Sequence, residues 1–438
     1  MSGTPPSEWH GGLPLPPNFR KLSFAERRTL LLELASGAGV EEAQFDDDLL
    51  GLGRSDVADS LVESAIGYLP VPFGVASGFI IDGHPVSVPM AVEEPSVIAA
   101  ATYAARLVAG EGGFTTWATP PEMVAHVYLE GARPDGASAV LAGRTEIEHC
   151  LEPLLESMRA RGGGLRAIGA DSIAELALLR VSVTIDVQDA MGANLLNTAA
   201  ESIAPLLEKL TGGTAIMKIL TNEASGRRAG ASLAIPVERL RRGALSGDES
   251  ARRIVLASDI ARFDSSRAVT HNKGVMNGIS ALALATGNDT RGIEAAVHRY
   301  ASRDGVYRGV TRYEVSGGVL RGRIEIPLPM ATTGGSVGFQ AATAFALELL
   351  GHPDGPTLSR IAAAVGLGQN FAALFALVTD GIQKGHMRLH AARLALQAGA
   401  AGDEIREVGR RIAEGGRFTR DEAVRILSQL HERQGAGE

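Results

Sequence analysis

The stretch from residue 119 to residue 221 constrains the fold most, because strand and helix patterns alternate along it. Strand patterns occur at 123–131, 176–187 and 215–222, and amphipathic helix patterns occur at 145–160 and 194–213. A β-α-β-α-β run of this size can form a sheet with helices on one face. We therefore expect it to fold as a small separate domain.

The flanking segments differ from this run, which indicates that it interrupts a larger domain. Residues 71–92 read as two apolar strands joined by a turn at Ile81-Asp82-Gly83, and residues 93–113 read as the helix that follows. We expect an α+β fold with three parts. They are a large mixed helix and sheet domain (1–118 and 222–375), an inserted small α/β-sandwich of the ferredoxin-like kind (119–221) and a C-terminal helical segment (376–438).

Length, charge and cysteine content narrow the class of protein. The 438 residues suffice for at least two hydrophobic cores, and a composition of 45% hydrophobic and 21% charged residues is typical of globular proteins. A net charge of −8 argues against a nucleic-acid partner. Cys150 is the sole cysteine, which excludes an intrachain disulfide and suits a reducing compartment. The Pro- and Gly-rich first residues lack a signal-peptide pattern and no stretch reads as a membrane span, so we expect a cytoplasmic protein without a membrane partner.

Lysine is rare in this chain. The 42 basic residues include five lysines: Lys21, Lys209, Lys218, Lys273 and Lys384. Lys273 lies in the segment 271–278, His-Asn-Lys-Gly-Val-Met-Asn-Gly, which is dense in polar groups. Taken alone, such a segment is as often a solvated loop as a functional site.

Two interpretations of the chain after Lys273 place Asp289 differently. Asn277-Gly278 predicts a turn and Ser280 can cap a short helix, which would bring Lys273 and Asp289 into one site. A single straight helix over 274–287 would instead separate them by about 20 Å. The capping pattern favours the shorter helix.

Two adjacent carboxylates, Glu93 and Glu94, stand between an apolar strand and an apolar helix, just before Pro95 and Ser96. Acidic residues at this position commonly favour the positive end of the helix dipole. Alternatively, one of the two carboxyl groups is buried enough to act as a general acid.

Two glycine-containing segments invite a comparison with dinucleotide sites. Asp189–Asn194 connects a strand to a helix, where backbone N–H groups can bind phosphate, although simple capping is the commoner role. Gly162-Gly163-Gly164 matches a fingerprint spacing but follows a helix rather than a strand. We therefore interpret the triple glycine as a helix cap and turn.

His386 and His390 are spaced i, i+4 on one predicted helix face. That spacing can bind zinc, but no third ligand is evident in the sequence. One surface histidine and one functional histidine is an equally good interpretation.

Together these segments resemble class II, bacterial-type 3-hydroxy-3-methylglutaryl-coenzyme A (HMG-CoA) reductase. The matching motifs include VEEPSVIAAA, DVQDAMGANLLNT, SSRAVTHNKGVMNGI, ATGNDTR, AVGLGQN and GIQKGHMRLHA, and the matching stretches cover nearly the whole chain. The combination and spacing of EEPS, DAMGAN and THNKG is highly specific. The resemblance implies interconversion of HMG-CoA with mevalonate and coenzyme A by two hydride transfers that use NAD(P)H.

The resemblance assigns four catalytic residues, Glu94, Lys273, Asp289 and His386. Lys273 would stabilise the oxyanion that forms at the thioester carbonyl, and Glu94 would supply a proton to it. Asp289 would keep the Lys273 ammonium charged. His386 would protonate the departing thiolate from a C-terminal flap that closes over the substrate.

The resemblance also implies binding residues and no metal. For the substrate they are Arg267 and Ser96 at the carboxylate, Asn222 and Asn370 near the reacting end, and Arg20 at coenzyme A. For the dinucleotide they are Asp189, Met191, Gly192 and Asn194 on the small domain.

Two segments depart from the family pattern. The family's ENVIG-like segment, which tends to lie at a subunit interface, reads ESAIG at Glu63–Gly67. Leu155 stands where relatives that use NADH can carry Asp, with Glu156 beside it. Glu156 can accept ribose hydroxyls, whereas Arg159 or Arg161 would favour a 2′-phosphate. We expect NADH or NADPH as cofactor, with a preference for NADH.

Two other classes of function stay open at this point. One is a zinc-dependent hydrolase that uses His386 and His390. The other is a non-catalytic acyl-coenzyme A binder, against which the four intact catalytic residue types argue. The resemblance further implies a homodimer, or an assembly of dimers, with the site at the interface.

Overall fold

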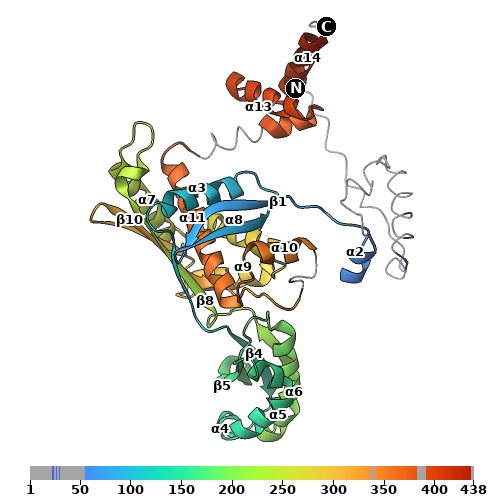
Figure 1. Cartoon of the computed structure of the whole chain (residues 1–438). Helices are drawn as coiled ribbons and strands as arrows, with labels where there is room; N and C mark the ends of the chain where they lie inside the picture. Colours follow the sequence, from blue (N-terminus) through green and yellow to red (C-terminus); the bar gives the residue numbers. More distant parts are fainter. Residues whose placement is uncertain are drawn as a thin grey trace, which may run out of the picture. The chain divides into compact units, whose positions relative to one another are not determined.

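The computed structural model describes residues 55–335, 337, 341–381 and 391–435, along with the isolated positions 22, 23, 26 and 29 (Figure 1). The chain divides into two compact units, residues 1–72 and 73–438. In the first unit the structure describes helix α2 (Ser55–Leu61), and the segment Glu63–Gly67 that follows has neither helix nor strand. The elements below belong to the second unit.

Residues 122–221 form a ferredoxin-like βαββαβ unit. Its elements are β4 (Glu122–Glu130), α4 (Gly136–Ala142), α5 (Arg144–Arg159), β5 (Gly164–Ile173), the 3₁₀ turn η3 (Ala174–Leu176), β6 (Leu178–Asp186), α6 (Ala193–Thr211) and β7 (Thr214–Thr221). The strands form one antiparallel sheet in the order β5-β6-β4-β7. This arrangement confirms the α+β class with a ferredoxin-like small sandwich.

Alternation along the central strands builds the core of this unit. Met123, Ala125, Val127 and Leu129 on β4 are buried while the residues between them are half-exposed. Every second residue of β6 is buried in the same way, and the apolar stripes of α5 and α6 cover this face. Strand β5 was not predicted, because its residues at the sheet edge show no clean alternation.

The triple glycine connects α5 to β5, as its interpretation as a cap and turn required. Gly162 and Gly164 have φ of 91° and 110°, which side chains rarely adopt. A Cβ on Gly163 would lie 2.6 Å from the backbone oxygen of Asp186. These glycines therefore serve a close helix-to-strand turn, and their rejection as a dinucleotide fingerprint is confirmed.

The remaining elements before residue 381 form the larger part of the unit, with the long helix α11 (Gly355–Val378) at its centre (Figure 1). They are β1 (Phe73–Ile81), β2 (His84–Ala91), α3 (Val97–Ala109), β3 (Thr115–Ala118), β8 (Arg228–Pro236), the 3₁₀ turn η4 (Val237–Leu240), α7 (Gly247–Phe263), α8 (Ser265–Ala285), α9 (Thr290–Ala301), β9 (Thr311–Ser316), β10 (Val319–Pro327), α10 (Ala341–Leu349) and α11 (Gly355–Val378). β1 and β2 form the predicted hairpin, and a second antiparallel sheet has the order β3-β8-β10-β9.

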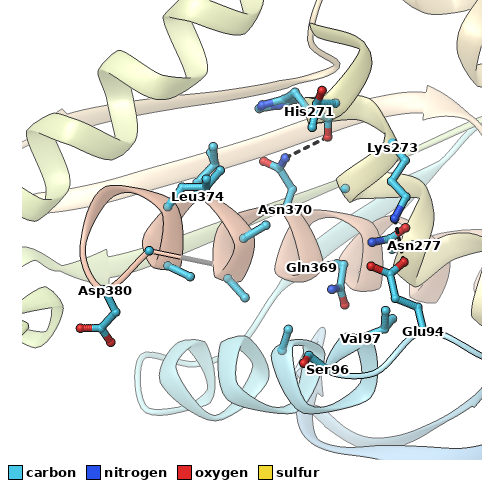
Figure 2. A pocket seen from close by; sticks show the side chains of 18 of the residues that line it. Glu94, Ser96, Val97, His271, Lys273, Asn277, Gln369, Asn370, Leu374 and Asp380 are labelled. Atoms are coloured by element: carbon cyan, nitrogen blue, oxygen red, sulfur yellow. Dashed lines mark hydrogen bonds and ion pairs between the residues drawn. The ribbon is translucent and has the colours of Figure 1, made fainter. Parts of the chain in front are cut away.

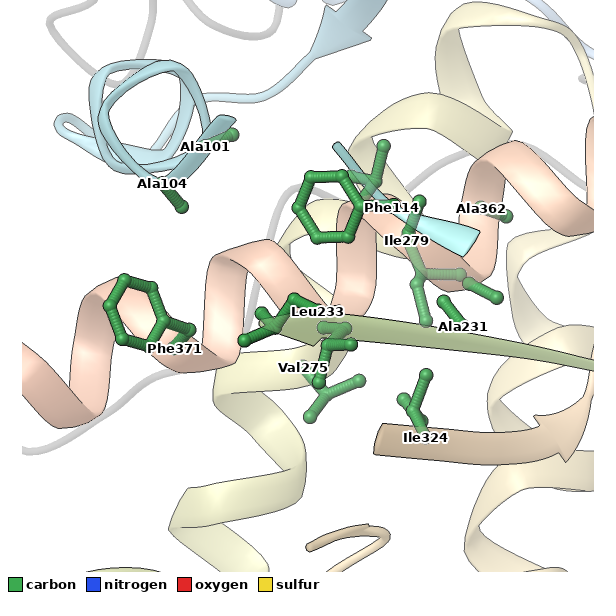
Figure 3. Packing of buried hydrophobic residues seen from close by; sticks show 14 of the residues in the cluster. Ala101, Ala104, Phe114, Ala231, Leu233, Val275, Ile279, Ile324, Ala362 and Phe371 are labelled. Atoms are coloured by element: carbon green, nitrogen blue, oxygen red, sulfur yellow. The ribbon is translucent and has the colours of Figure 1, made fainter. Parts of the chain in front are cut away.

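The core of this larger part gathers on α11, which contacts α3, α8 and the four-stranded sheet. Figure 3 shows Phe371 and Ala362 of α11 beside Val275 and Ile279 of α8, with Phe114 nearby. All five side chains are buried. Their burial fixes α3, α8 and α11 against one another, and these three helices carry the site described below.

Helix α11 corrects one expectation from the sequence. Its 24 residues are long and apolar enough to cross a membrane by length and composition, although no such stretch was predicted. In the structure 78% of its most apolar stretch is buried inside the protein. Its apolar character is thus explained by its place at the centre of the core.

Helix α8 corrects a second expectation. It runs unbroken from Ser265 to Ala285, so the predicted turn at Asn277-Gly278 does not form. A Cβ on Gly278 would lie 3.0 Å from Val365 Cγ1 and 3.1 Å from Gln369 Cβ on α11. Gly278 therefore permits the close approach of two helices, which is a helix-interior use of glycine that the turn interpretation missed.

The C-terminal part contains α13 (Asp403–Gly415) and α14 (Arg420–Gly435), preceded by helical residues from 391. Ala391, Leu394, Val408, Ile412 and Ile426 form a small core of their own. The expected helical character of this segment is confirmed where the structure describes it.

Candidate functional site

A cavity of about 700 Å³ opens between the start of α3, one face of α8 and the second half of α11. We call it the substrate cavity. Among the predicted site residues, it is lined by Glu94, Ser96, Arg267, Lys273 and Asn370. These residues span some 280 positions of the sequence, and the packing of the three helices brings them together.

Lys273 and Glu94 form an ion pair inside this cavity. Lys273 Nζ donates a hydrogen bond to Glu94 Oε2 at 2.7 Å (Figure 2). The side chains are 58% and 35% exposed, so the pair is open to the cavity rather than sealed in the core. Glu93 is exposed and does not line the cavity, so Glu94 alone fits the general-acid interpretation of the paired carboxylates.

Ser96 lies at the start of α3 in a strained backbone conformation. Its φ of 77° and ψ of −13° fall in the left-handed region that non-glycine residues seldom adopt. Its hydroxyl oxygen is buried, does not cap the helix and has no hydrogen-bond partner. Strain of this kind concentrates at binding sites, where it fixes a side chain in position.

Arg267 enters the substrate cavity from the first turn of α8. Asp264 caps this helix and accepts hydrogen bonds from the backbone N–H groups of Ser266 and Arg267. Burial lowers the pKa of the Arg267 guanidinium, and Asp264 partly opposes that shift. The guanidinium is thus a partly desolvated cation facing a cavity.

Unpaired polar atoms concentrate at this cavity. Among the described residues, seven buried side-chain nitrogen or oxygen atoms lack a hydrogen-bond partner. Four of the seven belong to residues that line the substrate cavity: Ser96 Oγ, Arg267 Nη1, His271 Nδ1 and Gln369 Oε1. Because unpaired buried polar groups are costly, this concentration indicates a site for a polar ligand.

Asn370 is held in a buried polar network under the cavity. Its Oδ1 accepts hydrogen bonds from the hydroxyls of Thr311 and Tyr313 at 2.9 and 3.1 Å, and its Nδ2 donates to the backbone oxygen of His271. His271 Nε2 in turn lies 2.6 Å from Thr311 Oγ1. Burial, together with Arg267 and Arg312, lowers the pKa of His271 to about 3, so its imidazole is neutral.

The cavity lining also includes polar residues that were not assigned from the sequence, among them Thr270, Asn277 and Gln369. Figure 2 shows Asn277 beside the Lys273–Glu94 pair and Gln369 facing it from α11. Thr270 and Asn277 stand three and four residues from Lys273, which places them on the same helix face. That spacing could have identified both, had 271–278 been interpreted as helix.

Asp289 and Asn222 lie apart from the substrate cavity. Asp289 caps α9 through the backbone N–H groups of Arg291 and Gly292. A Cβ on Gly292 would lie 3.0 Å from Asp289 Oδ2 and 3.4 Å from Asn222 Oδ1, so both side chains extend to the same side of Gly292. From Lys273 to the end of α8 the helix rises about 18 Å. Within one chain, Lys273 and Asp289 therefore do not share a site, contrary to the short-helix prediction.

The predicted dinucleotide loop lies close to Asp289. Asp189 Oδ1 accepts from the backbone N–H of Gly355, and the Asp189 carbonyl accepts from Thr332 and Thr333. The neighbouring Ala331 forms two hydrogen bonds with Asn288, the residue before Asp289. We call Asn222, Asp289 and the loop Asp189–Asn194 the junction cluster.

Helix α6 begins in the junction cluster without a side-chain cap. Its N-cap is Gly192 with φ of 86°, and a Cβ there would lie 2.8 Å from Val187 Cγ1. The exposed side chain of Asn194 lies in the first turn of the helix. An uncapped helix start with glycine at its edge suits the phosphates of a dinucleotide.

The buried side chain of Arg227 holds the loop Asp189–Asn194 in position. It donates hydrogen bonds to the backbone oxygens of Ala190 and Met330, and burial lowers its pKa to about 10. A charge buried to this degree is costly unless it is well paired. Arg227 thus connects this loop to the segment around residue 330 through hydrogen bonds to both.

Three predicted residues lie outside the described part of the chain: Arg20, His386 and His390. Within the described residues no group of three His, Cys, Asp or Glu side chains is arranged to hold a metal ion. The zinc interpretation of the histidine pair concerns residues outside this part.

Comparison with known proteins gives consistent results. A family model described as hydroxymethylglutaryl-coenzyme A reductase matches residues 23–391. The chain is 42% identical over 423 residues to 3-hydroxy-3-methylglutaryl-coenzyme A reductase of Archaeoglobus fulgidus, with 94% of each chain covered. It is 36% identical over 374 residues to the probable enzyme of Borreliella burgdorferi, with 85% of each chain covered.

Among solved structures, the chain resembles class II 3-hydroxy-3-methylglutaryl-CoA reductase from Streptococcus pneumoniae bound to NADPH. The TM-score is 0.73 at 37% sequence identity, with 94% of this chain and all of the other covered.

Proposed function

Because the chain belongs to the hydroxymethylglutaryl-coenzyme A reductase family, we propose that the substrate cavity binds the hydroxymethylglutaryl group. The enzyme is an oxidoreductase that interconverts HMG-CoA and mevalonate with a nicotinamide cofactor. The observation that carries the site assignment is the Lys273–Glu94 pair at 2.7 Å in a cavity where buried polar atoms lack partners. The steps below are our proposals for its residues.

Lys273 is the electrophilic group of the reaction. Its ammonium lies in the cavity, where it can donate a hydrogen bond to the thioester oxygen and stabilise the negative charge that develops there. Glu94, already bonded to Lys273, supplies or accepts the proton at that oxygen. This differs from the general acid expected from burial, because the Glu94 side chain is 35% exposed and ion-paired.

Arg267 and Ser96 hold the free carboxylate of the hydroxymethylglutaryl group. Each presents a buried polar donor without a partner, and an arginine fork matches a carboxylate in shape and charge. Asn370 lies at the floor of the cavity, near the reacting end of the substrate. The hydroxyls of Thr311 and Tyr313 donate hydrogen bonds to its side-chain oxygen and so fix its orientation.

The nicotinamide dinucleotide binds at the junction cluster, on Asp189, Met191, Gly192 and Asn194. The uncapped start of α6 supports this assignment. When bound, a reduced nicotinamide supplies one hydride, so each HMG-CoA requires two successive molecules of the reduced cofactor. Asp189 and Arg227 hold the loop in position for it.

The active site is completed by a second copy of the chain. One chain carries Glu94 and Lys273 in the substrate cavity, beside the middle of α8, and Asp289 with Asn222 in the junction cluster, beyond the C-terminal end of α8. A twofold dimer can bring the junction cluster of one chain to the substrate cavity of the other. Asp289 would then meet Lys273 across the interface.

We further propose the domain boundaries and the remaining roles as follows. Residues 119–221 form the dinucleotide domain, inserted into the substrate domain of 1–118 and 222–375. The separate hydrophobic cores of the two parts support this division. Residues 376–438 form a flap that carries His386, the proton donor to the thiolate, and Arg20 contacts coenzyme A.

The test of this function is a direct assay. Purified protein is mixed with HMG-CoA and either NADH or NADPH, and absorbance at the nicotinamide band is followed. We expect two equivalents of reduced cofactor to be consumed per HMG-CoA, with release of free thiol. Absence of turnover with both cofactors, in either direction, would overturn the proposal.

A further inference from the structure

A second cavity, of about 580 Å³, lies over the four-stranded sheet and is rich in arginine. We call it the arginine cavity. Four arginines line it: Arg262 at the end of α7, Arg312 on β9, and Arg321 and Arg323 on β10. It shares no lining residue with the substrate cavity.

Strand register places two of these arginines directly opposite each other. β9 and β10 pair antiparallel with Arg312 facing Arg323, and Ser232 of β8 is the next residue in the same row. Like charges in directly opposed positions destabilise a sheet unless something neutralises them. This pair therefore makes no favourable contribution to the sheet on its own.

The four arginines lack close carboxylate partners among the residues that the structure describes. Elsewhere in the large domain arginines pair with acids, as Arg239 does with Glu111 at 2.8 Å. Within the described part of the chain, none of the four arginines in the arginine cavity forms such an ion pair. Arg312 donates hydrogen bonds to the backbone oxygens of Gly309 and Thr311, which hold its guanidinium in place.

The remaining acids leave an excess of positive charge. Glu111 is already paired with Arg239, and Glu314 stands opposite Arg321 in the register. Asp259 is then the one lining acid left for Arg262, Arg312 and Arg323. Burial and the nearby charges of Arg262, Arg303 and Arg323 lower the pKa of Arg312, and Asp259 only partly opposes this shift, which reflects the same crowding.

We propose that the arginine cavity binds a phosphate or diphosphate group of a small molecule, with Arg312 and Arg323 as its main ligands and Arg262 as a third. A phosphate group carries up to two negative charges and accepts paired hydrogen bonds from guanidinium groups. One such group can neutralise both members of the opposed arginine pair at once. A monocarboxylate can neutralise only one of them.

Pyrophosphate is the probe for this site, and R323Q and R321Q are a matched pair of variants. Both arginines are exposed on β10 and have no ion pair among the described residues, but Arg321 faces Glu314 whereas Arg323 faces Arg312. Pyrophosphate is titrated calorimetrically into the full-length wild type and both variants, with ionic strength held constant and mevalonate saturating the substrate cavity. Succinate serves as the dicarboxylate control.

We expect saturable pyrophosphate binding in the wild type that R323Q weakens about tenfold or more and R321Q changes by less than threefold. Pyrophosphate that binds at other positions, including the start of α6, gives a signal that is the same in R323Q and in the wild type. Without ligand, R323Q should unfold at the same temperature as the wild type or higher, because it removes a like-charge contact. A purely structural role for Arg323 would lower that temperature instead.

Three outcomes would overturn the proposal. In the first, R323Q removes none of the pyrophosphate binding seen in the wild type. In the second, R323Q and R321Q weaken this binding equally. In the third, succinate binds as tightly as pyrophosphate. Coenzyme A also carries phosphates, so the KM for HMG-CoA is measured in parallel. We expect R323Q to leave it within twofold, and a rise as large as the loss of pyrophosphate affinity would instead assign the cavity to coenzyme A.

Discussion

Lys273 shows how a single side chain can be placed for chemistry by its helix. It projects from the middle of α8 toward Glu94, and one turn away Asn277 points to the same place (Figure 2). An ammonium is a compact charge on a flexible stem, which suits an oxyanion that appears only during the reaction. In a chain that otherwise prefers arginine, this explains why a lysine is found here.

Replacement of Lys273 by Ala should lower kcat by about 10²–10³ or more, because a positioned donor to the oxyanion is lost. The measurement is steady-state turnover of HMG-CoA, repeated with the free aldehyde intermediate, and both should suffer. Lys209, exposed in the last turn of α6, provides the matched control. Turnover of Lys273→Ala close to that of Lys209→Ala would contradict the assignment.

The buried His271 couples stability to pH. Burial chiefly lowers its pKa from 6.5 to about 3, so the unfolded chain binds a proton that the folded chain does not between these values. The contribution of the neutral His271 side chain to the free energy of unfolding is complete above pH 6.5. It is lost progressively as the pH falls toward 3. At pH 5 the loss amounts to about 2 kcal/mol.

Urea unfolding at pH 7 and pH 5 tests this coupling. The wild type should lose about 2 kcal/mol more than His271→Gln does over this interval, since the amide keeps a donor for Thr311 but does not titrate. His84→Gln removes an exposed histidine and should behave like the wild type. The same pH dependence in all three proteins would show that another group is responsible.

Cofactor preference also belongs to single residues. Leu155 is 2% exposed in the core of the small domain, so its side chain is not available to a ribose. Glu156 beside it is exposed, and Arg159 is already paired with Glu152 at 3.0 Å. On the exposure of Glu156 and the ion pair of Arg159 we propose a preference for NADH, as expected from the sequence.

The ratio of kcat/KM for NADH to that for NADPH measures this preference. We expect a ratio above one, and Glu156→Gln should lower it about tenfold, because hydrogen bonds from the ribose to a charged acceptor are lost. Glu148→Gln, an exposed glutamate earlier on α5, is the control. A ratio below one in the wild type would show that the 2′-phosphate is favoured.

At the scale of elements, the unbroken helix α8 determines where the functional groups lie. Its inner face packs on α11 through Gly278, while another face presents Arg267, Thr270, Lys273 and Asn277 to the substrate cavity. The same straight helix carries the chain away from the cavity before Asp289 is reached. Helix packing therefore separates, within one chain, the two groups of residues that we propose to form one active site.

Substitution of Gly278 by Val should destabilise the protein by about 1–3 kcal/mol, because the new side chain has no room against Val365. Gly274 lies on the same helix, where a Cβ would meet nothing within 4 Å. Gly274→Ala should therefore stabilise by about 0.5–1 kcal/mol through helix propensity alone. Chemical unfolding measures both, and equal effects would argue against close packing at Gly278.

Sequence patterns predicted those elements for which the local sequence favours the same secondary structure as the packing in the folded protein. The β1–β2 hairpin, the alternating strands β4 and β6 and the helix α6 are of this kind. Edge strand β5 lacks alternation, and α8 contains Gly and Asn that are loop formers by themselves. For α8 the deciding contribution is burial against α11, which no local pattern reveals.

Five of the predicted site residues lie together in the structure, but the arrangement of the site was not predicted. Glu94, Ser96, Arg267, Lys273 and Asn370 do line one cavity. Asn277 and Gln369 were missed because their role depends on which helix face meets the cavity. The placement of Asp289 was wrong because the length of α8 was underestimated.

For the whole molecule, the separation of the two half-sites is the central feature. Lys273 lies near the middle of α8 and Asp289 lies beyond its C-terminal end, yet both are proposed to act on one thioester. A dimer reconciles these statements if each active site takes its substrate cavity from one chain and its junction cluster from the other. Each variant that lacks one residue would then be complemented by the other.

Activity of a mixed dimer tests this account most directly. Lys273→Ala and Asp289→Ala chains are co-expressed with different tags, and the dimer that contains one of each is purified. One of its two sites would then combine both defects and the other would be intact, so we predict about half of the wild-type kcat, while each variant alone is nearly inactive. A mixed dimer no more active than the two parent variants would contradict the shared active site.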